Sequence, residues 1–423
     1  MKRWRLPTAG FAVLSLLAIA GCGSSSGSSA GSGGGKVNIG LLAEFSGARA
    51  TLGPAKLQGM EYGAQLINAA GGCDGKTVKI DEIDGPDPVD TQTNLTHALA
   101  LDNLSLVVGP DVNSYTTALP TMESDKMVNF TYIGTPGVYS SAHYAYSYRS
   151  GPSDAFVGAA MAYYAHVKGY KRIAIAISSD IGGQDLIPSI KAEAKSFGLT
   201  IVANESIPIS ITTYAGYIKA ILNAKPDAVL FQLTTAGDAG PWATQWQADG
   251  GTNIPIIGSD FTAAGPYVQA MGVSYTEKHL VSAIPALAVS GSYGAAFVNG
   301  FTKKFNTTPP IYASHFYDSM MIACLAMDMA HSTTPSVYNS DILKVTQPVP
   351  GATTVYTYAQ GYKLIKEGKR IKYYGVGGSM TFTPDHSVTG PYQVVTTAAN
   401  GNTTVLTNIA ADKLQAGASA GSG

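Results

Sequence analysis

Three residues with the chemistry of a phosphate-binding loop, Gly75, Lys76 and Thr77, end the stretch GGCDGKT at 71–77. A P-loop has the spacing G-x-x-x-x-G-K-[ST] and lies between a strand and the helix that follows it. The first glycine of that pattern would be residue 70, which is alanine. The stretch also follows a helical pattern and precedes a strand-like run, which is the reverse order. We therefore predict a helix end and a turn at 71–77, without a nucleotide site.

Other catalytic constellations find no support in the sequence. No G-x-S-x-G nucleophile motif stands at a strand-to-helix junction, where an α/β-hydrolase would need it. The seven histidines show neither H-x-x-x-H nor H-x-x-E-H spacing, and two of the three cysteines stand alone in the folded part of the chain. We therefore expect no enzyme activity, no cofactor and no metal site.

The elements that must position any site alternate regularly along the chain. Short apolar runs predict strands at 37–43, 77–84, 104–110 and 127–134, and again at 172–178, 199–207, 227–233 and 254–260. Amphipathic stretches between them predict helices at 54–72, 90–102, 114–126, 154–170, 184–198, 213–226 and 237–251. Such alternation is typical of parallel sheets with helices on both faces. Two such sets predict an α/β protein with two lobes.

The N-terminal 22 residues have the pattern of a secretory signal. A basic start precedes a short apolar run at 11–20, which is too short for a permanent membrane span. The run ends in IAGC, which resembles the lipobox of bacterial lipoproteins and implies cleavage before Cys22 and acylation of its thiol. The Gly/Ser-rich stretch 23–35 then reads as a flexible tether. An incidental cysteine after an apolar run is the alternative.

Charge and cysteine content narrow the partners. Without residues 1–21 the chain keeps 24 of its 27 basic residues against 28 acidic ones, a formal charge of −4, and it has no large basic cluster. We therefore expect no nucleic-acid partner. Cys73 and Cys324 would lie in an exported protein, where they form either a disulfide or two free thiols. The sequence alone does not bring them together.

Seven segments, taken in order, resemble the substrate-binding proteins of branched-chain amino acid ABC importers. The resemblance begins with VNIGLLAEFSGARATLGPAKLQGMEYGAQLINAAGGCDGKTVKI at 37–80 and continues with LVVGPDVNSYTTALP, FTYIGTP and YRSGPSDAFVGAAMAYY. It also includes IPIIGSDF, HFYDSMMIACLAMD and GSMTFTPDHSVTGPYQVV, and so spans 37–395. The order of the segments is more specific than any one of them.

The resemblance implies a type I periplasmic-binding-protein fold, in which two Rossmann-like lobes with parallel sheets are joined by three crossover strands. The crossings are expected near 147–149, 283–285 and 388–390. The implied division is a signal peptide at 1–21, the lipidated cysteine and tether at 22–36, and a tail at 411–423. Lobe 1 would comprise 37–147 and 284–387, and lobe 2 would comprise 148–283 and 388–410.

The resemblance also implies ligand-binding positions at the carboxyl ends of the strands. Asn113 or Ser114 would bind a carboxylate, and Thr135 with the Ile133 carbonyl would bind the α-groups of an amino acid. Asp260 would hold the ammonium group. Each has a structural alternative: Ser114 as a helix N-cap, Thr135 as a turn residue, and Asp260 as the cap of a following helix.

Three positions depart from the aromatic lining that is typical of the family. Leu52, Gly182 and the pair Thr234–Thr235 stand where tyrosines are expected. The cleft is therefore predicted to be roomier or more polar than in leucine binders. Four aromatic residues are candidates to compensate, and each also suits ordinary packing: Phe45, Tyr139, Trp242 and Phe261.

The resulting hypothesis is a monomeric, lipid-anchored protein on the outer face of the cell membrane that captures a small amino acid, branched-chain or a related aliphatic one. It would deliver the ligand to an ABC permease, whose separate ATPase subunit explains why this chain needs no P-loop. The alternatives are a ligand of another class (a short amide, urea or an aromatic acid) and a role in sensing instead of transport. An ionised Asp260 favours an amine-bearing ligand, because an amide has little use for a full charge there.

Overall fold

The computed structural model describes residues 34–414 except 48, 51, 113, 132–133, 135–143, 287–291 and 311, and the side chain of residue 292. The predictions for the signal peptide, for Cys22 and for most of the tether lie outside the described residues, as does the tail from 415 onward. The described part of the chain belongs to one compact unit, Gly34–Gly423.

The first large sheet has five parallel strands in the order β2-β1-β3-β4-β5. The strands are β1 (Lys36–Ala43), β2 (Thr77–Asp84), β3 (Leu104–Val108), β4 (Asn129–Thr131) and β5 (Ser147–Arg149). The helices between them are α1 (Gly53–Ala69), α2 (Pro88–Leu101) and α3 (Tyr115–Ser124). The predicted strand at 77–84 and the β2 bounds are the same, because its apolar run is delimited by a turn on each side.

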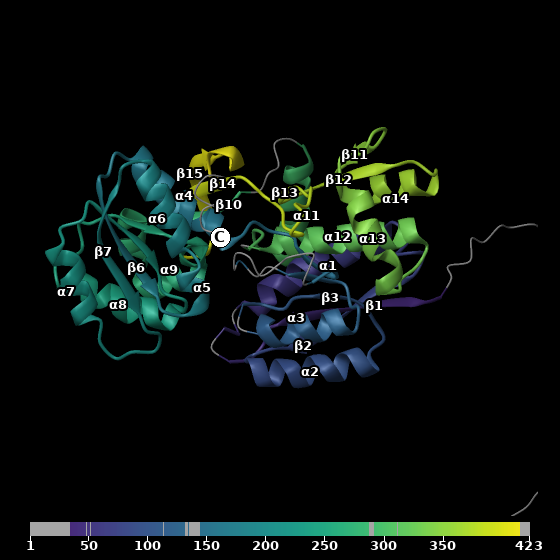
Figure 1. Ribbon diagram of the computed structural model, residues 1–423, viewed down its shortest axis with the longest axis horizontal. Helices are drawn as coiled ribbons and strands as arrows, with labels where there is room; N and C mark the ends of the chain where they lie inside the picture. Colours follow the sequence, from purple (N-terminus) through teal and green to yellow (C-terminus); the bar gives the residue numbers. More distant parts are fainter. Residues whose placement is uncertain are drawn as a thin grey trace, which may run out of the picture. The chain divides into compact units, whose positions relative to one another are not determined.

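Helices cover both faces of this sheet, and they come from two distant parts of the chain (Figure 1). On one face, α2 and α3 pack on Leu42 and Val107, while α1 packs on the other with helices that follow residue 292. These later helices are α11 (Ser292–Phe305), α12 (Ala313–Ala330), α13 (Pro335–Thr346) and α14 (Tyr358–Lys366). A small sheet of β11 (Thr353–Val355), β12 (Ile371–Gly375) and β13 (Gly378–Ser379) completes this first lobe.

The second large sheet has seven strands in the order β15-β14-β10-β9-β8-β6-β7. The strands are β6 (Arg172–Ser178), β7 (Thr200–Ile207), β8 (Ala228–Gln232), β9 (Ile256–Gly258), β10 (Leu280–Pro285), β14 (Tyr392–Thr397) and β15 (Thr403–Ile409). The first five of these pair in parallel. Four of them, β6 to β9, lie at predicted strands, whereas β10 was expected only as a crossing near 283–285. The antiparallel hairpin of β14 and β15 at one edge was not predicted, because its polar-rich sequence carries a weak strand signal.

Alternate residues of the central strand β6 enter two separate cores, as the two-residue period of a strand requires. Ile173, Ile175 and Ile177 pack with α4 (Asp154–Val167) and α6 (Ile187–Ser196). Ala174 and Ala176 face the opposite core. The remaining elements of this second lobe are α5 (Ile181–Gln184), α7 (Ala215–Asn223), α8 (Ala236–Ala248), η1 (Asp260–Ala263), α9 (Gly265–Met271), α10 (Val273–His279) and η2 (Ala411–Lys413).

The turn at 71–77 is a connection between α1 and β2, as predicted. Gly72 has φ +83°, and a Cβ atom there would lie 2.1 Å from the Lys76 carbonyl oxygen. Cys73 and Lys76 close the turn through paired backbone hydrogen bonds of 2.9 and 3.0 Å. The glycines therefore serve a tight reversal, and a helix precedes the turn where a P-loop would need a strand.

The chain passes between the two lobes at three places, near those that the resemblance implied. The first passage follows β5, the second follows β10, and the third precedes β14. The passages contact one another through their backbones. Arg149 and Ser387 form an isolated parallel β-bridge, and the Ala286 amide donates a hydrogen bond to the Pro391 carbonyl at 2.9 Å. The three connections therefore form one hinge region of paired backbone.

Cys73 and Cys324 form a disulfide with their Cα atoms 5.1 Å apart. The bridge joins the turn before β2 to α12, so it lies inside the first lobe. No helix in the described ranges combines the length and the apolar character needed to cross a membrane. Among the same residues, no cluster of three or more His, Cys, Asp or Glu side chains could hold a metal ion.

Candidate ligand-binding site

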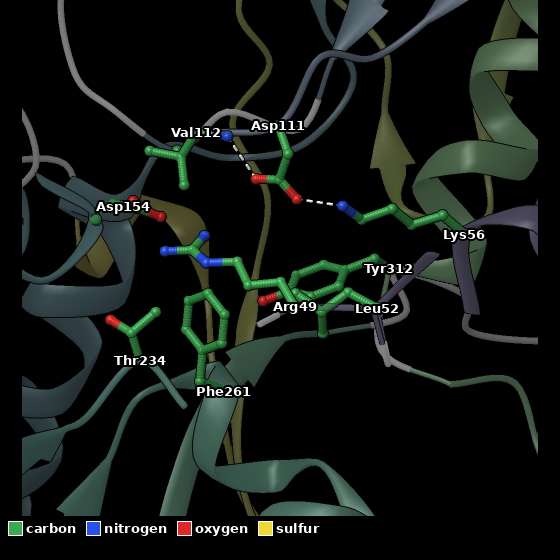
Figure 2. A pocket seen from close by; sticks show the side chains of 11 residues that line it. Arg49, Leu52, Lys56, Asp111, Val112, Asp154, Thr234, Phe261 and Tyr312 are labelled. Atoms are coloured by element: carbon green, nitrogen blue, oxygen red, sulfur yellow. Dashed lines mark hydrogen bonds and ion pairs between the residues drawn. The ribbon is translucent and has the colours of Figure 1, made fainter. Parts of the chain in front are cut away.

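A pocket that is partly open to solvent lies where loops from both large sheets meet (Figure 2). It forms at the carboxyl ends of the parallel strands, which is the usual place for a ligand in an open α/β sheet. Its lining is Arg49, Leu52, Lys56, Asp111, Val112, Gly134, Asp154, Gly182, Thr234, Phe261 and Tyr312.

Lys56 is held on one wall of the pocket by two carboxylates. This α1 side chain is buried, and its Nζ lies 3.0 Å from Glu44 Oε2 and also contacts Asp111 Oδ2. Burial raises the pKa of Asp111, but the Lys56 and Arg49 charges outweigh burial and lower that pKa to about 2. The Lys56 ammonium is therefore already neutralised within the protein.

Arg49 crosses the pocket from the loop after β1 to the second lobe. Its Nη2 lies 3.3 Å from Asp180 Oδ2, and its side chain is 9% exposed. Asp180 is fixed in turn, because it accepts hydrogen bonds from Ser178 Oγ at 2.7 Å and from Thr234 Oγ1 at 2.6 Å. The result is an ion pair between the two lobes beside the pocket.

Asp154 supplies a carboxylate to the opposite wall from the first turn of α4. Its backbone amide donates to the Gly134 carbonyl at 2.7 Å, which holds the helix start against the pocket. Among the described residues, no side chain or backbone group donates a hydrogen bond to the Asp154 carboxylate. Burial, with the nearby charges of Asp260 and Asp185, raises the pKa of Asp154 well above its ordinary value, against the effect of Arg149.

Asp260 lies directly behind this wall and is 3% exposed. Its Oδ2 accepts a hydrogen bond of 2.8 Å from the Tyr312 hydroxyl, and its Oδ1 accepts one of 3.0 Å from the Phe261 amide. Burial raises the pKa of Asp260 to about 6, although both hydrogen bonds act in the other direction. Tyr312 and Phe261 therefore line the pocket, while Asp260 stands one layer further back.

Some of the residues predicted to bind ligand line the pocket, and others do not. Leu52 and Thr234 line the pocket. Thr235 is outside the lining and caps α8, where its Oγ1 accepts from the Asp238 amide at 3.1 Å. Ser114 occupies the N-cap position of α3 but makes no side-chain cap hydrogen bond. Asn113, Ile133 and Thr135 lie outside the described residues.

The aromatic candidates also divide. Phe261 lines the pocket, whereas Trp242 is fully buried in a core, where its ring stacks on Trp246 at 5.0 Å. Phe45 packs against the core of the first lobe, and its amide donates to Asp84 Oδ1 at 2.8 Å. Tyr139 lies outside the described residues. Of the three aromatic candidates that the structure describes, Phe261 therefore is the one that lines the pocket.

Sequence reasoning missed all four charged residues of the lining: Arg49, Lys56, Asp111 and Asp154. Two weak signals were present. Arg49 is a lone cation among small residues just after a strand, and Asp154 begins a helix after Gly-Pro-Ser. Each pattern also suits a solvated loop or a helix start, so neither identified a binding residue.

These features agree with the comparisons to known proteins. The family model described as "Periplasmic binding protein" matches residues 36–402, so the chain belongs to the periplasmic binding protein family. Its fold is the type I form of that family, as the resemblance implied. No curated protein matches the chain.

Several solved structures share the fold at low sequence identity. The substrate-binding protein LivJ of Streptococcus pneumoniae, in complex with isoleucine, is 20% identical with a TM-score of 0.72, and the match covers 89% of this chain and 99% of that one. The leucine-binding protein LivK of Thermotoga maritima is 16% identical with a TM-score of 0.72 over the same shares. A solute-binding protein of Rhodopseudomonas palustris in complex with benzoate is 15% identical, with a TM-score of 0.70 and coverage of 89% and 97%.

Proposed function

We propose that this protein is the solute-binding component of an ABC importer and that it captures a small amino acid, branched-chain or a related aliphatic one. The observation that carries the proposal is the Asp154 carboxylate, which lines the pocket without a hydrogen-bond donor among the described residues. A carboxylate in such a place needs a cation, and an ammonium group supplies both charge and donors. Asp260, behind Tyr312, adds a second negative charge to the same wall.

The charges around the pocket favour an amine over a simple acid. Among the described residues in and behind the lining, the acidic side chains outnumber the basic ones: Glu44, Asp111, Asp154, Asp180, Asp185 and Asp260 stand against Arg49, Lys56 and Arg149. A zwitterion would add no net charge to this acidic site, whereas benzoate would add a further negative charge. The apolar lining residues Leu52, Val112 and Phe261 suit an aliphatic side chain. An aromatic acid, such as the benzoate bound by the Rhodopseudomonas palustris protein, is the second candidate.

The proposed mechanism is reversible capture, in which residues of both lobes contact the ligand and hinge motion encloses it. The loaded monomer would dock on a membrane permease, and a separate ATPase subunit would drive transport. Cys22 would carry the lipid that anchors the protein at the outer face of the membrane. These partners follow from the resemblance and from the family, and no bond is broken by this chain.

The direct test is a thermal-shift screen of the compact unit from Gly34 onward against amino acids, short amides, urea and aromatic acids. A ligand present at 100 times its Kd stabilises the folded state by about 2.7 kcal/mol, which shifts the melting temperature measurably. Stabilisation by leucine, isoleucine or valine is the expected result. Stabilisation by aromatic acids alone would reject the amino acid proposal and favour the second candidate.

A single substitution tests the role of Asp154. Asp154→Asn should weaken amino acid binding by about 2–5 kcal/mol, because the ligand ammonium would be buried without its counter-ion. Isothermal titration calorimetry measures the change in Kd. Asp249→Asn, which alters an exposed aspartate at the end of α8, is the matched control. Equal affinity of the two variants would assign Asp154 a structural role.

A further inference from the structure

The Arg49 guanidinium combines burial with an unused donor. Its Nη2 is engaged by Asp180 at 3.3 Å, but its Nη1 is buried and has no hydrogen-bond partner in the part of the chain that the structure describes. Leaving a buried charged donor unpaired costs more than leaving a neutral one unpaired. A bound molecule that offers an acceptor to Nη1 would remove this cost.

The pocket is the place where a bound molecule could offer an acceptor to Nη1. Figure 2 shows the guanidinium extending from the loop after β1 into the hollow, between Asp154 on one side and Tyr312 and Phe261 on the other. A guanidinium presents its N–H groups as a planar fork that matches a carboxylate. An acceptor on a bound molecule would therefore meet Nη1 inside the pocket.

The other basic groups at the pocket are already engaged. Lys56 is held by Glu44 and Asp111. Arg149 donates from Nη1 to the Gly134 carbonyl at 3.3 Å and from Nη2 to Ser387 Oγ at 2.8 Å. Of the two cations in the described lining, Arg49 and Lys56, Arg49 is the one with a buried donor that has no hydrogen-bond partner among the described residues.

We infer that Arg49 is the residue that selects for a carboxylate on the ligand, with Nη1 donating to it while Asp180 holds Nη2. The inference rests on the proposed amino acid function and adds the residue that distinguishes an amino acid from an amine or an amide. Asp180 is itself fixed by Ser178 and Thr234, so the guanidinium is held in place once the two lobes have approached. Arg49 and Asp180 belong to different lobes, so their ion pair exists only when the two lobes are close together. The ligand carboxylate would bind beside this ion pair.

The test pairs a change in the ligand with a change in the protein. Calorimetry on the full chain in detergent measures L-leucine, L-isoleucine and L-valine, each beside its carboxamide, with the wild type and with Arg49→Ala, Arg49→Lys and Arg370→Ala. The amide keeps the ammonium group and the side chain but removes the negative charge. Arg370→Ala removes an exposed arginine of the first lobe and is the matched control.

The wild type and Arg370→Ala should prefer the amino acid over its amide by at least about 30-fold, which is typical of a buried charge pair that loses one partner. In Arg49→Ala the amino acid should bind at least about 30-fold more weakly, and the preference over the amide should fall to nearly nothing. Arg49→Lys should restore part of the preference, because it keeps the charge without the fork.

Two results would overturn the inference in different ways. If the wild type binds amino acids but Arg49→Ala keeps the full preference over the amide, then another group reads the carboxylate and the proposed function stands. If the wild type binds none of the three amino acids, the proposed function fails and the inference fails with it. Melting curves of every variant without ligand show whether the fold is intact, so a lost preference is not confused with unfolding.

Discussion

At the scale of single residues, the site is governed by how its buried charges are matched. Asp111 and Glu44 compensate Lys56, and Asp180 compensates one side of Arg49. The remaining Arg49 donor has no hydrogen-bond partner among the described residues, and the Asp154 carboxylate receives no hydrogen bond from them. A buried charge without a partner is costly, so these two groups mark where a ligand of complementary charge is missing.

Asp260 gives this balance a dependence on pH. Because burial raises its pKa from 3.8 to about 6, the folded state holds a proton that the unfolded chain has released between those values. The stabilisation of the folded state by the proton on Asp260 is therefore present below about pH 4 and is lost as the pH rises through about 6. A shift of about two pKa units corresponds to about 3 kcal/mol.

Asp260→Asn should therefore flatten the pH dependence of the ligand-free protein. Urea denaturation at pH 4 and pH 7 should show a smaller fall in the free energy of unfolding for the variant than for the wild type, by about 2–3 kcal/mol. Comparison with the wild type removes the contributions of other carboxylates, and Asp249→Asn serves again as the exposed control. An identical change with pH for variant and wild type would contradict the assignment.

At the scale of elements, the site is assembled by the carboxyl ends of parallel strands. Arg49 follows β1, Asp111 follows β3, Asp180 follows β6, Thr234 follows β8 and Phe261 follows β9. In a parallel sheet these ends share one edge, so loops far apart in the sequence converge there. The geometry of the pocket is thus a consequence of the order of strands and helices.

This explains how much the sequence could predict. The strand at 172–178 agrees residue for residue with β6, because its Ile and Ala residues are buried on both faces and read as a continuous apolar run. The same periodicity placed loops such as that of Thr234 at the correct sheet edge. It could not show that Asp154 would remain without a donor while Thr235 would cap its own helix, because these outcomes depend on contacts between distant segments.

Close packing of two helices tests the first lobe at this scale. Gly59 of α1 lies against the start of α12, and a Cβ atom there would come 2.4 Å from the Ala313 carbonyl oxygen. Gly59→Ala should lower the free energy of unfolding by about 1–3 kcal/mol, because the helices must separate or distort. Urea denaturation measures the change.

Gly216→Ala is the matched control, since Gly216 lies in α7 and a Cβ atom there meets open space. This substitution should raise the free energy of unfolding by up to about 1 kcal/mol through helix propensity alone. Stabilisation by both substitutions would show that α1 and α12 are not in close contact in solution.

At the scale of the whole molecule, the first lobe is built from two segments that are far apart in the sequence. Strands β6 to β10 of the second large sheet lie between these two segments. β1 to β5 precede that insertion, and α11 to α14 follow it. The disulfide between Cys73 and Cys324 links these two segments across 251 residues. Closing so long a loop in the unfolded chain removes conformational entropy from it, so the bridge should stabilise the folded lobe.

Replacing both cysteines with alanine should therefore lower the free energy of unfolding by about 2–5 kcal/mol, with the loss concentrated in the first lobe. Thermal and urea denaturation would show the variant unfolding earlier, while a reducing agent should shift the wild type toward the variant and leave the variant unchanged. Because neither cysteine lines the pocket, the Kd for ligand below the transition should stay the same. A variant as stable as the oxidised wild type would mean that the two-segment lobe holds together by packing alone, and that the covalent link adds nothing measurable to it.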